Sequence, residues 1–443
     1  MDVANPEADY EHYGRFIPLT RQAVIADLCQ DPDGRIGGSL DDFARLAVKL
    51  QAYRNRQYRA VAEEMRRCYL PFSPDRDTIS ALPFSPDEKR RMEASLIRQI
   101  DGLLERANYE VLREADINDI INKHEPHSLR VSVDLSEFER LRLYYRDEYT
   151  ETVTYRRPEW AYLKKTTYEL ASFRRLFLLL KLKSAEDQIE ALMKAKKLRR
   201  WRAERIVRAQ RDYLPKGTSS EFIYLKVFKN LPKHDIQILF PNRKVAFRPF
   251  DKIKFGVTAG GGTLMGIVTT ATKIAATTSP FTIVAAMLAF IGVVGRQIAS
   301  FFNHRTRYMM ELAQKLFFHS LANNRAALAL LLDRAEEEDV KEDLITLYFF
   351  AGEAIAEAGV PERRRHIEEV FRTRYNVGVD FDIDDCLSRL ERDGVVTRTA
   401  AAALSFPTHA QAAAHYDRMW RESDEVDIGH VCDPPPPDEL HEA

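Results

Sequence analysis

The sequence predicts an α+β membrane protein, and three observations lead to this fold class. The segment 255–302 contains almost no charged residue. Hydrophobic residues up to about residue 115 recur with helical spacing, and after that the spacing changes to the two-residue alternation of β-strands. We therefore expect a helical N-terminal region, an α+β domain with an antiparallel sheet, a transmembrane helical hairpin and a C-terminal winged-helix-like domain.

The composition is that of a folded protein without a dominant charge. The chain has 443 residues, 45% of them hydrophobic, and its 66 Lys and Arg residues almost balance 67 Asp and Glu residues. This balance gives no overall field to attract nucleic acid or acidic substrates, so any such attraction must be local. The four cysteines form no CxxC pair, which argues against a zinc ribbon or a disulfide framework and favours a reducing compartment.

The region before the apolar segment divides into two predicted parts. In the helical N-terminal region, 1–115, apolar residues recur near every 3.6 positions, as they do from Phe43 to Tyr58. The α+β domain, 116–250, has predicted strands at 129–135, 141–155, 173–182 and 221–228. The N-terminus lacks the basic start and apolar run of a signal peptide, so we expect it to stay on the side of synthesis.

The apolar segment has the length of two bilayer crossings and a turn. A crossing helix needs about 20 residues, and the hairpin domain, 251–302, offers two such runs with a turn at 277–280. Lysines and arginines flank both ends of the hairpin, which predicts that both ends face the cytoplasm, or the corresponding side of a mitochondrial-type membrane. Small residues on the two arms have the spacing for close helix packing in lipid: Gly256, Gly260, Gly262, Gly266, Ala285 and Ala289.

Other interpretations of this segment remain open. It can be a buried hairpin inside a soluble domain, or a re-entrant wedge, which its glycines favour. Gly260–Gly262 suggests a phosphate loop, but Met265 stands where a GxGxxG motif needs its last glycine. We expect the lipid bilayer to be the partner of this segment. The small residues then pack either within the chain or between copies in a homo-oligomer.

A basic, helix-like segment lies between two of the predicted strands and has two interpretations. In the first, it contacts anionic lipid headgroups, and the candidate contacts are Lys196, Lys197, Arg199 and Arg200. In the second, it is a solvated helix whose charge is diluted by Glu186, Asp187, Glu190 and Glu204. The sequence does not decide between them.

The region after the apolar segment has three predicted parts. A connecting helix covers 303–338, a winged-helix-like domain covers 339–410, and an acidic, Pro-rich tail covers 411–443, which we expect to be disordered. In the middle part, the pattern predicts helices at 341–358, 361–372 and 383–393 and a β-wing at 395–406.

The charge of the third helix bears on what this domain binds. Many winged helices read DNA with their third helix in the major groove. Here Asp384, Asp385, Glu391 and Asp393 outweigh Arg389 and Arg392, and a phosphate backbone would be repelled. Nucleic acid is therefore disfavoured as a partner, and docking of another protein is favoured.

Four sequence blocks resemble a known family. They are Tyr13–Thr20, Tyr224–Asp235, Leu239–Pro241 and Val379–Asp385, and together they resemble the transmembrane protein 143 family, whose shared domain is catalogued as being of unknown function. The resemblance implies a membrane protein with a paired hydrophobic segment and no known reaction. The family usually carries an acidic residue soon after the position of Asp235, where this chain has Gln237.

One block contains a candidate polar cluster. A strand is expected to turn through Pro232 into a helix that is directed toward the membrane segment. The polar cluster at this turn, a candidate coupling point, consists of Lys226, Lys229, Lys233, His234 and Asp235. A helix start with Asp235 in its first turn explains the same residues equally well.

No catalytic motif has the required spacing. The chain lacks a Gly-x-Ser-x-Gly, a His-Glu-x-x-His and a Walker motif, and Pro126 makes His124 and His127 a turn rather than a helical metal site. We therefore expect no catalytic residue, metal or cofactor. The expected function is that of a membrane-anchored protein that docks partners. The alternative is an oligomeric channel or permeation pathway lined by the Gly/Thr-rich arm of the hairpin.

Overall fold

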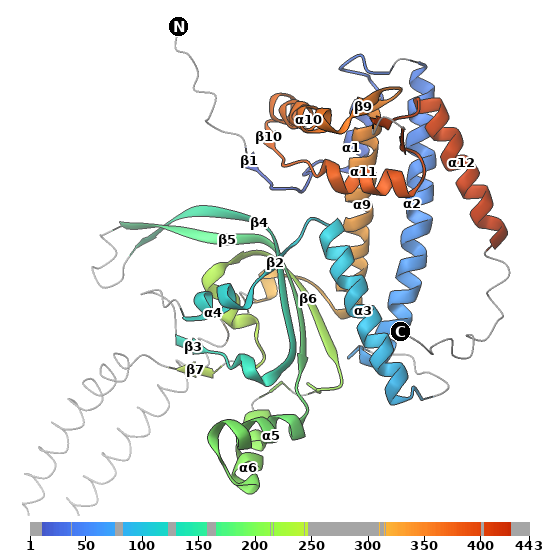
Figure 1. Cartoon of the computed structure of the whole chain (residues 1–443). Helices are drawn as coiled ribbons and strands as arrows, with labels where there is room; N and C mark the ends of the chain where they lie inside the picture. The colour runs from blue at the N-terminus through green and yellow to red at the C-terminus, as the bar shows by residue number, and fades with distance from the viewer. Residues whose placement is uncertain are drawn as a thin grey trace, which may run out of the picture. The chain divides into compact units, whose positions relative to one another are not determined.

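The computed structural model describes most of the chain outside the apolar segment. The described residues are 11–36, 38–75, 83–122, 130–156, 165–212, 214–215, 217–242, 244–246, 310, 314, 316–399 and 403–426. They form two compact units (Figure 1). Unit 1 combines Met1–Glu110 with Asn324–Ala443, and unit 2 is Val111–Asn323.

Unit 2 is built on a five-stranded sheet. The strand order is β2-β4-β5-β6-β8, and the pairings β4–β5, β5–β6 and β6–β8 are antiparallel. The strands are β2 (Glu110–Leu112), β4 (Phe138–Arg156), β5 (Lys165–Leu182), β6 (Ile223–Pro232) and β8 (Ser320–Asn323). The two longest strands pair from Phe138↔Leu182 to Arg156↔Lys165. The alternation that predicted strands in this region is therefore confirmed.

The core of unit 2 lies on one face of this sheet. Residues two apart on a strand point to the same face, and Leu176, Leu178, Leu180 and Leu182 of β5 accordingly belong to one buried cluster with Phe240. Shorter elements complete the unit: α4 (Glu114–Asn122), β3 (Arg130–Ser132), the 3₁₀ segments η2 (Leu135–Glu137) and η4 (Lys233–Leu239), and β7 (Lys244–Ala246), which pairs with β3.

Two short helices, α5 (Ala185–Lys196) and α6 (Arg200–Arg211), form a helical hairpin between β5 and β6 (Figure 1). The sequence had indicated one basic helical segment here. The structure divides it at Lys197, which takes a left-handed conformation (φ 48°) and ends α5. The two helices pack through a small apolar cluster of Ile189, Ala203 and Val207.

Unit 1 is mainly helical. Its helices are α1 (Arg21–Leu28), α2 (Leu40–Tyr69), α3 (Pro86–Arg106), α9 (Asn324–Phe350), α10 (Val360–Tyr375), α11 (Ile383–Arg392) and α12 (His409–Val426), and 3₁₀ turns η1 (Leu70–Phe72) and η5 (Glu357–Gly359) follow α2 and precede α10. Strands β9 (Ala354–Ala356), β11 (Thr397–Arg398) and β12 (Ala403–Ser405) form a small antiparallel sheet. Strands β1 (Glu11–His12) and β10 (Val377–Gly378) pair in parallel.

Local sequence signals explain where these helices begin and end. Ser39 caps α2, and Ser85 with Glu88 forms a capping box at α3, so orphan N–H groups of both first turns are satisfied. Asp382 caps α11, accepting a hydrogen bond from the Asp385 N–H. Gly394, at φ 71°, follows α11 in a conformation that glycine adopts without a Cβ clash.

The C-terminal part of unit 1 combines helices with short strands. Helix α9 is followed by β9, α10, α11 and the β11–β12 ribbon. The sequence had suggested a helix at 341–358 preceded by a separate connecting helix. Instead, one helix runs from Asn324 to Phe350, because Gly352 (φ 73°) allows a turn after it and residues 354–356 pair with β12.

The predicted membrane fold class requires correction. The described residues form an α+β fold with antiparallel sheets, and none of the helices within them combines the length and the apolar composition that a bilayer crossing requires. This finding contradicts the predicted transmembrane class and integral membrane location. The predicted hairpin, 251–302, with its six packing residues Gly256, Gly260, Gly262, Gly266, Ala285 and Ala289, lies outside the described residues.

Candidate functional site: a cavity between helices α2 and α9 beside a buried ion cluster

Helices α2 and α9 are the longest helices described in unit 1, and each contributes to both features of the candidate site. Along α2, the buried positions recur at helical spacing and include Arg54, Tyr58, Met65 and Tyr69. Along α9, only one stripe is buried up to Ala335, whereas every residue from Glu338 to Phe350 is buried. Charged side chains in this buried half must therefore be satisfied by partners inside the protein.

Arg389 of α11 is the centre of a buried ion cluster. Its Nε lies 2.9 Å from Asp343 Oδ1, and its Nη2 lies 2.8 Å from Glu342 Oε2. Its Nη1 lies 3.0 Å from Asp339 Oδ1 and 2.6 Å from Asp385 Oδ2. Three of these carboxylates come from α9, so one guanidinium joins α11 to α9.

A second arginine extends the cluster to α2. Arg54 Nε lies 2.8 Å from Asp343 Oδ2, and its Nη2 lies 2.5 Å from Asp393 Oδ2. Asp343 thus bridges the two arginines, whose side chains are only 3% and 4% exposed. The Tyr58 hydroxyl donates a 2.7 Å hydrogen bond to Asp339. These contacts tie α2, α9 and α11 together.

Three acidic groups of this cluster have raised pKa values. Burial raises the pKa of Glu342 to about 8 and that of Asp339 to about 6, and Arg389 partly opposes both shifts. Burial also raises the pKa of Asp393. A carboxyl group in a poorly solvated site is more easily protonated. At neutral pH we therefore expect Glu342 to carry a proton, which reduces the excess of negative charge around the two arginines.

This proton predicts a measurable pH dependence. The unfolded state loses the Glu342 proton near pH 4.5, and the folded state loses it near pH 8. Between these values the unfolded state binds fewer protons, so the stability of the folded state falls as the pH rises. In a Glu342→Gln variant, we expect the free energy of opening the segment 338–350, measured by hydrogen exchange between about pH 5 and 8, to fall less steeply than in wild type. Exposed Glu362→Gln is the control, and an unchanged slope in Glu342→Gln would contradict the prediction.

The same carboxylates could be considered as metal ligands. One oxygen or more from each of Asp339, Glu342 and Asp385 lies within 4.8 Å of the others. However, Arg389 already contacts all three. Since the guanidinium supplies the positive charge that a cation would supply, the geometry supports a structural ion cluster.

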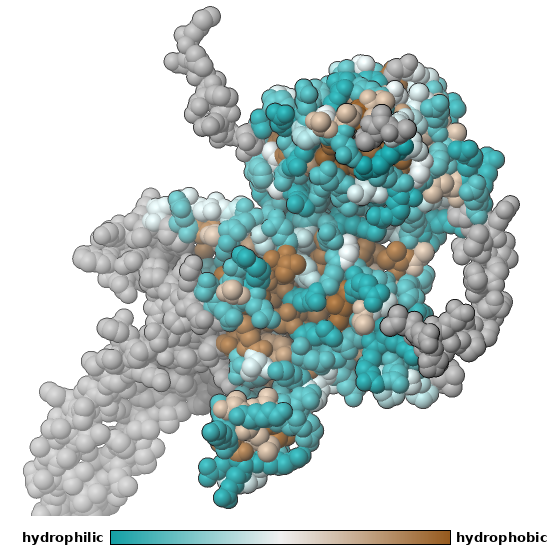
Figure 2. Space-filling model, in the orientation of Figure 1, coloured by the Kyte–Doolittle hydropathy of each residue, from teal (hydrophilic) through white to brown (hydrophobic). Residues whose placement is uncertain are grey.

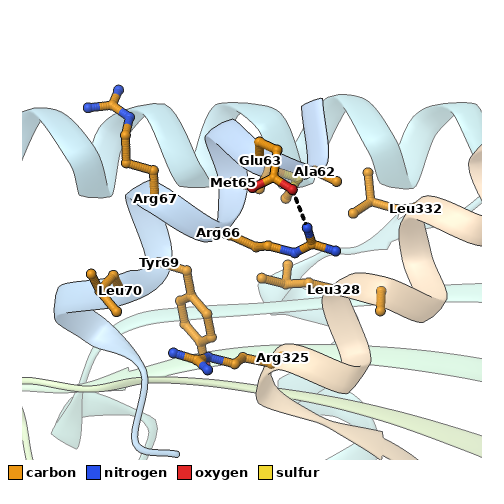
Figure 3. Close-up of a pocket in the computed structure, with 11 residues that line it drawn as sticks. Ala62, Glu63, Met65, Arg66, Arg67, Tyr69, Leu70, Arg325, Leu328 and Leu332 are labelled. Atoms are coloured by element: carbon orange, nitrogen blue, oxygen red, sulfur yellow. Dashed lines mark hydrogen bonds and ion pairs between the residues drawn. The ribbon is translucent and has the colours of Figure 1, made fainter. Parts of the chain in front are cut away.

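A cavity of about 420 Å³ lies between α2 and the N-terminal half of α9 (Figure 3). Its walls are mainly apolar and include Met65, Tyr69, Leu328 and Leu332. Figure 3 shows the two leucines on α9 and the tyrosine on α2. A volume of a few hundred Å³ with mostly apolar walls is typical of sites that bind ligands or partner side chains.

The charged residues at this cavity are mostly arginines. Arg66 and Arg67 come from the last turn of α2, and Arg325 comes from the first turn of α9. Arg66 extends from α2 toward Leu328 and forms an ion pair with Glu63, at 2.5 Å (Figure 3). Glu63 is the acidic residue among those lining the cavity, so the site is apolar inside and cationic at its edge.

A second cavity, of about 700 Å³, lies beside β1 and β10 and is more polar. Arginines line it as well, but acidic neighbours already engage two of them. Arg15 lies 2.9 Å from Asp382, and Arg364 pairs with both Glu368 and Asp380. The lining of this cavity is mostly charged or polar, whereas the α2–α9 cavity has apolar walls and is therefore the better candidate for binding an apolar group.

The residues of the predicted polar cluster lie on two successive elements of unit 2. Lys226 and Lys229 lie on β6, whereas Lys233, His234 and Asp235 lie on η4. Lys233 pairs with Glu148 of β4, and His234 Nε2 lies 3.5 Å from Asp235 Oδ1. The Lys229 carbonyl is 2.9 Å from His319 Nδ1. The contacts therefore serve several separate parts of unit 2.

The remaining predicted site residues lie in other parts of the chain. Lys196, Lys197, Arg199 and Arg200 lie together at the tip of the α5–α6 hairpin. His124 and His127 lie outside the described residues. The arginine cluster was not predicted, although its sequence contains a signal: Arg389 stands three residues after Cys386 on the apolar face of its helix.

The fold and the site define an α+β protein in which a helical unit carries an apolar cavity edged by arginines. Residues 138–326 match the model of a family described as a protein of unknown function, DUF3754, so the chain contains a DUF3754 domain. This range begins with β4 and ends just inside α9. No solved structure matches the chain.

Proposed function

We propose that unit 1 is a non-enzymatic docking domain that binds a protein segment in the α2–α9 cavity. The segment would place a large apolar side chain against Leu328 and Leu332, with acidic residues on either side facing Arg66 and Arg325. The observation that carries the proposal is the combination of apolar walls and an arginine edge in one cavity. Apolar anchors in pockets and charge complementarity at the edge are common features of protein recognition.

The composition of the cavity favours a protein partner over a small molecule. Aromatic residues, methionine and arginine are enriched at protein–protein interfaces, and the lining contains Tyr69, Met65 and three arginines. The strongly perturbed carboxyl groups do not line this cavity, since Asp339 and Glu342 are engaged by Arg389. This separation supports binding without catalysis at the site.

Winged-helix recognition of DNA has less support. Five of the ten residues of α11 are buried, and they include Arg389, which is engaged by carboxylates. The first turn of the helix carries Asp384 and Asp385. A helix with these properties offers few cations to a phosphate backbone, which supports protein docking as the role of this unit.

A site-specific photo-crosslinker at Ala329 tests the proposal, because this residue lines the cavity and is exposed. We expect crosslinks in cells to a discrete peptide with Leu, Phe, Met or Trp at the crosslinked position and at least two acidic residues within about one helical turn. The same peptide, made synthetically, should bind purified protein. Arg66→Glu should weaken this binding about tenfold or more, equivalent to about 1.4 kcal/mol.

The controls separate docking from other outcomes. A crosslinker at Val48, which is exposed on α2, should not yield the same peptide. Crosslinked peptides without an acidic, apolar pattern would reject the proposal. So would equal binding by the Arg66→Glu variant, or a tightly held small amphiphile found in the cavity by native mass spectrometry.

We also propose that the chain is related to the transmembrane protein 143 family. The block Tyr224–Asp235 supports this, since it lies within the matched domain and forms β6 and the start of η4. Two other blocks meet in unit 1, where the Asp380 N–H donates a 2.7 Å hydrogen bond to the Gly14 carbonyl. A permeation pathway would depend on residues 255–302, and no observation on the described residues favours it.

A further inference from the structure

The α5–α6 hairpin of unit 2 carries a concentrated positive charge. Residues 185–211 contain nine Lys or Arg residues and four Asp or Glu residues, although the whole chain is nearly neutral. Figure 2 shows the lobe formed by α5 and α6 as a mainly hydrophilic surface with a small brown patch. The hairpin is therefore the kind of local basic feature that can attract a polyanion despite a balanced net charge.

Internal contacts account for only part of this charge. Arg200 pairs with Glu186 and Glu204, and Arg211 donates to the Lys183 carbonyl. Lys194 and Lys196 lie in the last turn of α5, where cations favourably offset the helix dipole. Within the described part of the chain, by contrast, no ion pair involves Arg199, Arg205 or Arg208, and two of them lie on α6 itself.

The start of α6 is unusually basic for a helix N-terminus. Arg199 stands at the cap position without a side-chain hydrogen bond, and the first turn contains no acidic residue. Cations at this end oppose the helix dipole, whereas an anion is stabilised by the dipole and by the free N–H groups. A bound phosphate would relieve this local conflict.

An aromatic residue lies among the arginines on the outer face of α6. Ala203 and Val207 are the buried residues of this helix, and at 100° per residue Trp201, Arg205 and Arg208 fall on the opposite side. Trp201 is 54% exposed, and the Arg202 Cζ lies 5.0 Å from its ring centroid. The outer face thus offers cations together with a solvent-accessible aromatic ring.

This arrangement favours nucleic acid over a lipid surface. A helix that inserts into a membrane interface needs a free apolar face, but the main apolar side of α6 is occupied by packing against α5. Each nucleotide of a single strand has both a phosphate charge and a base face, which matches arginines beside an exposed tryptophan. An acidic peptide matches the cations but does not require the ring.

We propose that the α5–α6 hairpin binds single-stranded nucleic acid, with phosphates at Arg199, Arg205 and Arg208 and a base stacked on Trp201. The interaction is sequence-tolerant, because neither contact reads base edges. It is separate from the docking function proposed for unit 1, and either can fail without affecting the other.

The test is fluorescence anisotropy of the full chain with labelled oligo(dT) and oligo(U) of about 16 nucleotides, a length within single-strand site sizes. The logarithm of affinity should fall with the logarithm of salt concentration. The double variant Arg205→Gln/Arg208→Gln should reduce that slope by about 1.4, since each single-strand phosphate contact contributes about 0.7. Trp201→Ala should weaken binding at least about fivefold with little change in slope, and Trp201→Phe should retain most of the affinity.

Matched controls make the result decisive. Lys89→Gln/Arg90→Gln removes the same charge from exposed positions on α3 and should not change binding. Polyglutamate, polyphosphate and vesicles containing anionic lipid serve as competing ligands. The proposal is overturned if any of these binds as tightly as the oligonucleotides, if Trp201→Ala has no effect, or if neither oligonucleotide binds at low salt.

Discussion

Replacing Arg389 with methionine is expected to destabilise unit 1 by about 3–5 kcal/mol, because removing one partner of a buried ion pair leaves charges without compensation. The carboxylates of Asp339 and Asp343 lose a cation, and Glu342 loses a hydrogen-bond donor. All three side chains are at most 3% exposed. Methionine fills much of the space but supplies no donor. We expect much faster hydrogen exchange across 338–350 and a lower unfolding midpoint in urea.

The neighbouring Arg392 provides the control for this substitution. It lies in the last turn of the same helix but is exposed, so Arg392→Met should change stability by no more than about 0.5 kcal/mol. The Arg389→Met defect should also shrink toward pH 5, where the unpaired carboxyl groups take up protons. If the two variants proved equally stable, the ion cluster would not have the structural role assigned to it.

The secondary structure of unit 2 could be predicted because its signals are local. The strand predictions at 141–155 and 173–182 correspond closely to β4 and β5, since alternating or β-branched and aromatic runs fit a partly buried pleated sheet. The pairing of β2 with β4 could not be predicted in the same way. It depends on tertiary contacts, which no short window of sequence contains.

The ion cluster was missed because each of its residues has an adequate local explanation. Asp384 and Asp385 suit the first turn of α11, and the acidic run before Val340 could belong to an exposed helix face. Only the fold brings Arg54, Asp343 and Arg389 together from positions far apart in the sequence. The comparison of charges on α11 that disfavoured DNA binding counted Arg389 as a free cation. In the structure this arginine is buried and paired with carboxylates.

The cavity and the contact between two of the sequence blocks likewise could not be predicted, because both depend on tertiary structure. Met65 and Tyr69 lie in the N-terminal region that was predicted to be helical, but nothing local shows that α9 leaves space beside them. Likewise, the blocks Tyr13–Thr20 and Val379–Asp385 were noted only as resemblances. In the structure the Tyr13 N–H donates to the Gly378 carbonyl, and Arg15 pairs with Asp382. Their common role is to hold the N-terminal segment on the helical core.

A second buried ion pair, on α9, also attaches that N-terminal segment. Lys341 Nζ donates hydrogen bonds to the carbonyls of Ile17, at 2.6 Å, and Leu19, at 3.1 Å, and lies 2.5 Å from Glu338 Oε1. Glu338 Oε2 in turn accepts a hydrogen bond from the Ile17 N–H at 3.1 Å. The two side chains are 1% and 0% exposed.

In a Lys341→Met variant we therefore expect residues 11–20 to detach from α9. The substitution should destabilise the attached state of this segment by about 3–5 kcal/mol. Trypsin should then cleave after Arg15 and Arg21 about 100-fold faster or more, since cleavage tracks the population of the open segment. Lys89→Met, at an exposed position on α3, should leave cleavage unchanged. Limited proteolysis followed by mass spectrometry measures both rates.

A double variant separates loss of the ion pair from simple loss of packing. In Lys341→Met the Glu338 carboxylate stays buried without its cation, whereas Lys341→Met/Glu338→Gln removes that charge and keeps an acceptor for the Ile17 N–H. Replacing both members of a buried pair costs less than removing one. Cleavage of the double variant should consequently be slower than that of Lys341→Met. If it were faster, the two side chains would act independently, and packing of Ile17 rather than the ion pair would hold the segment on α9.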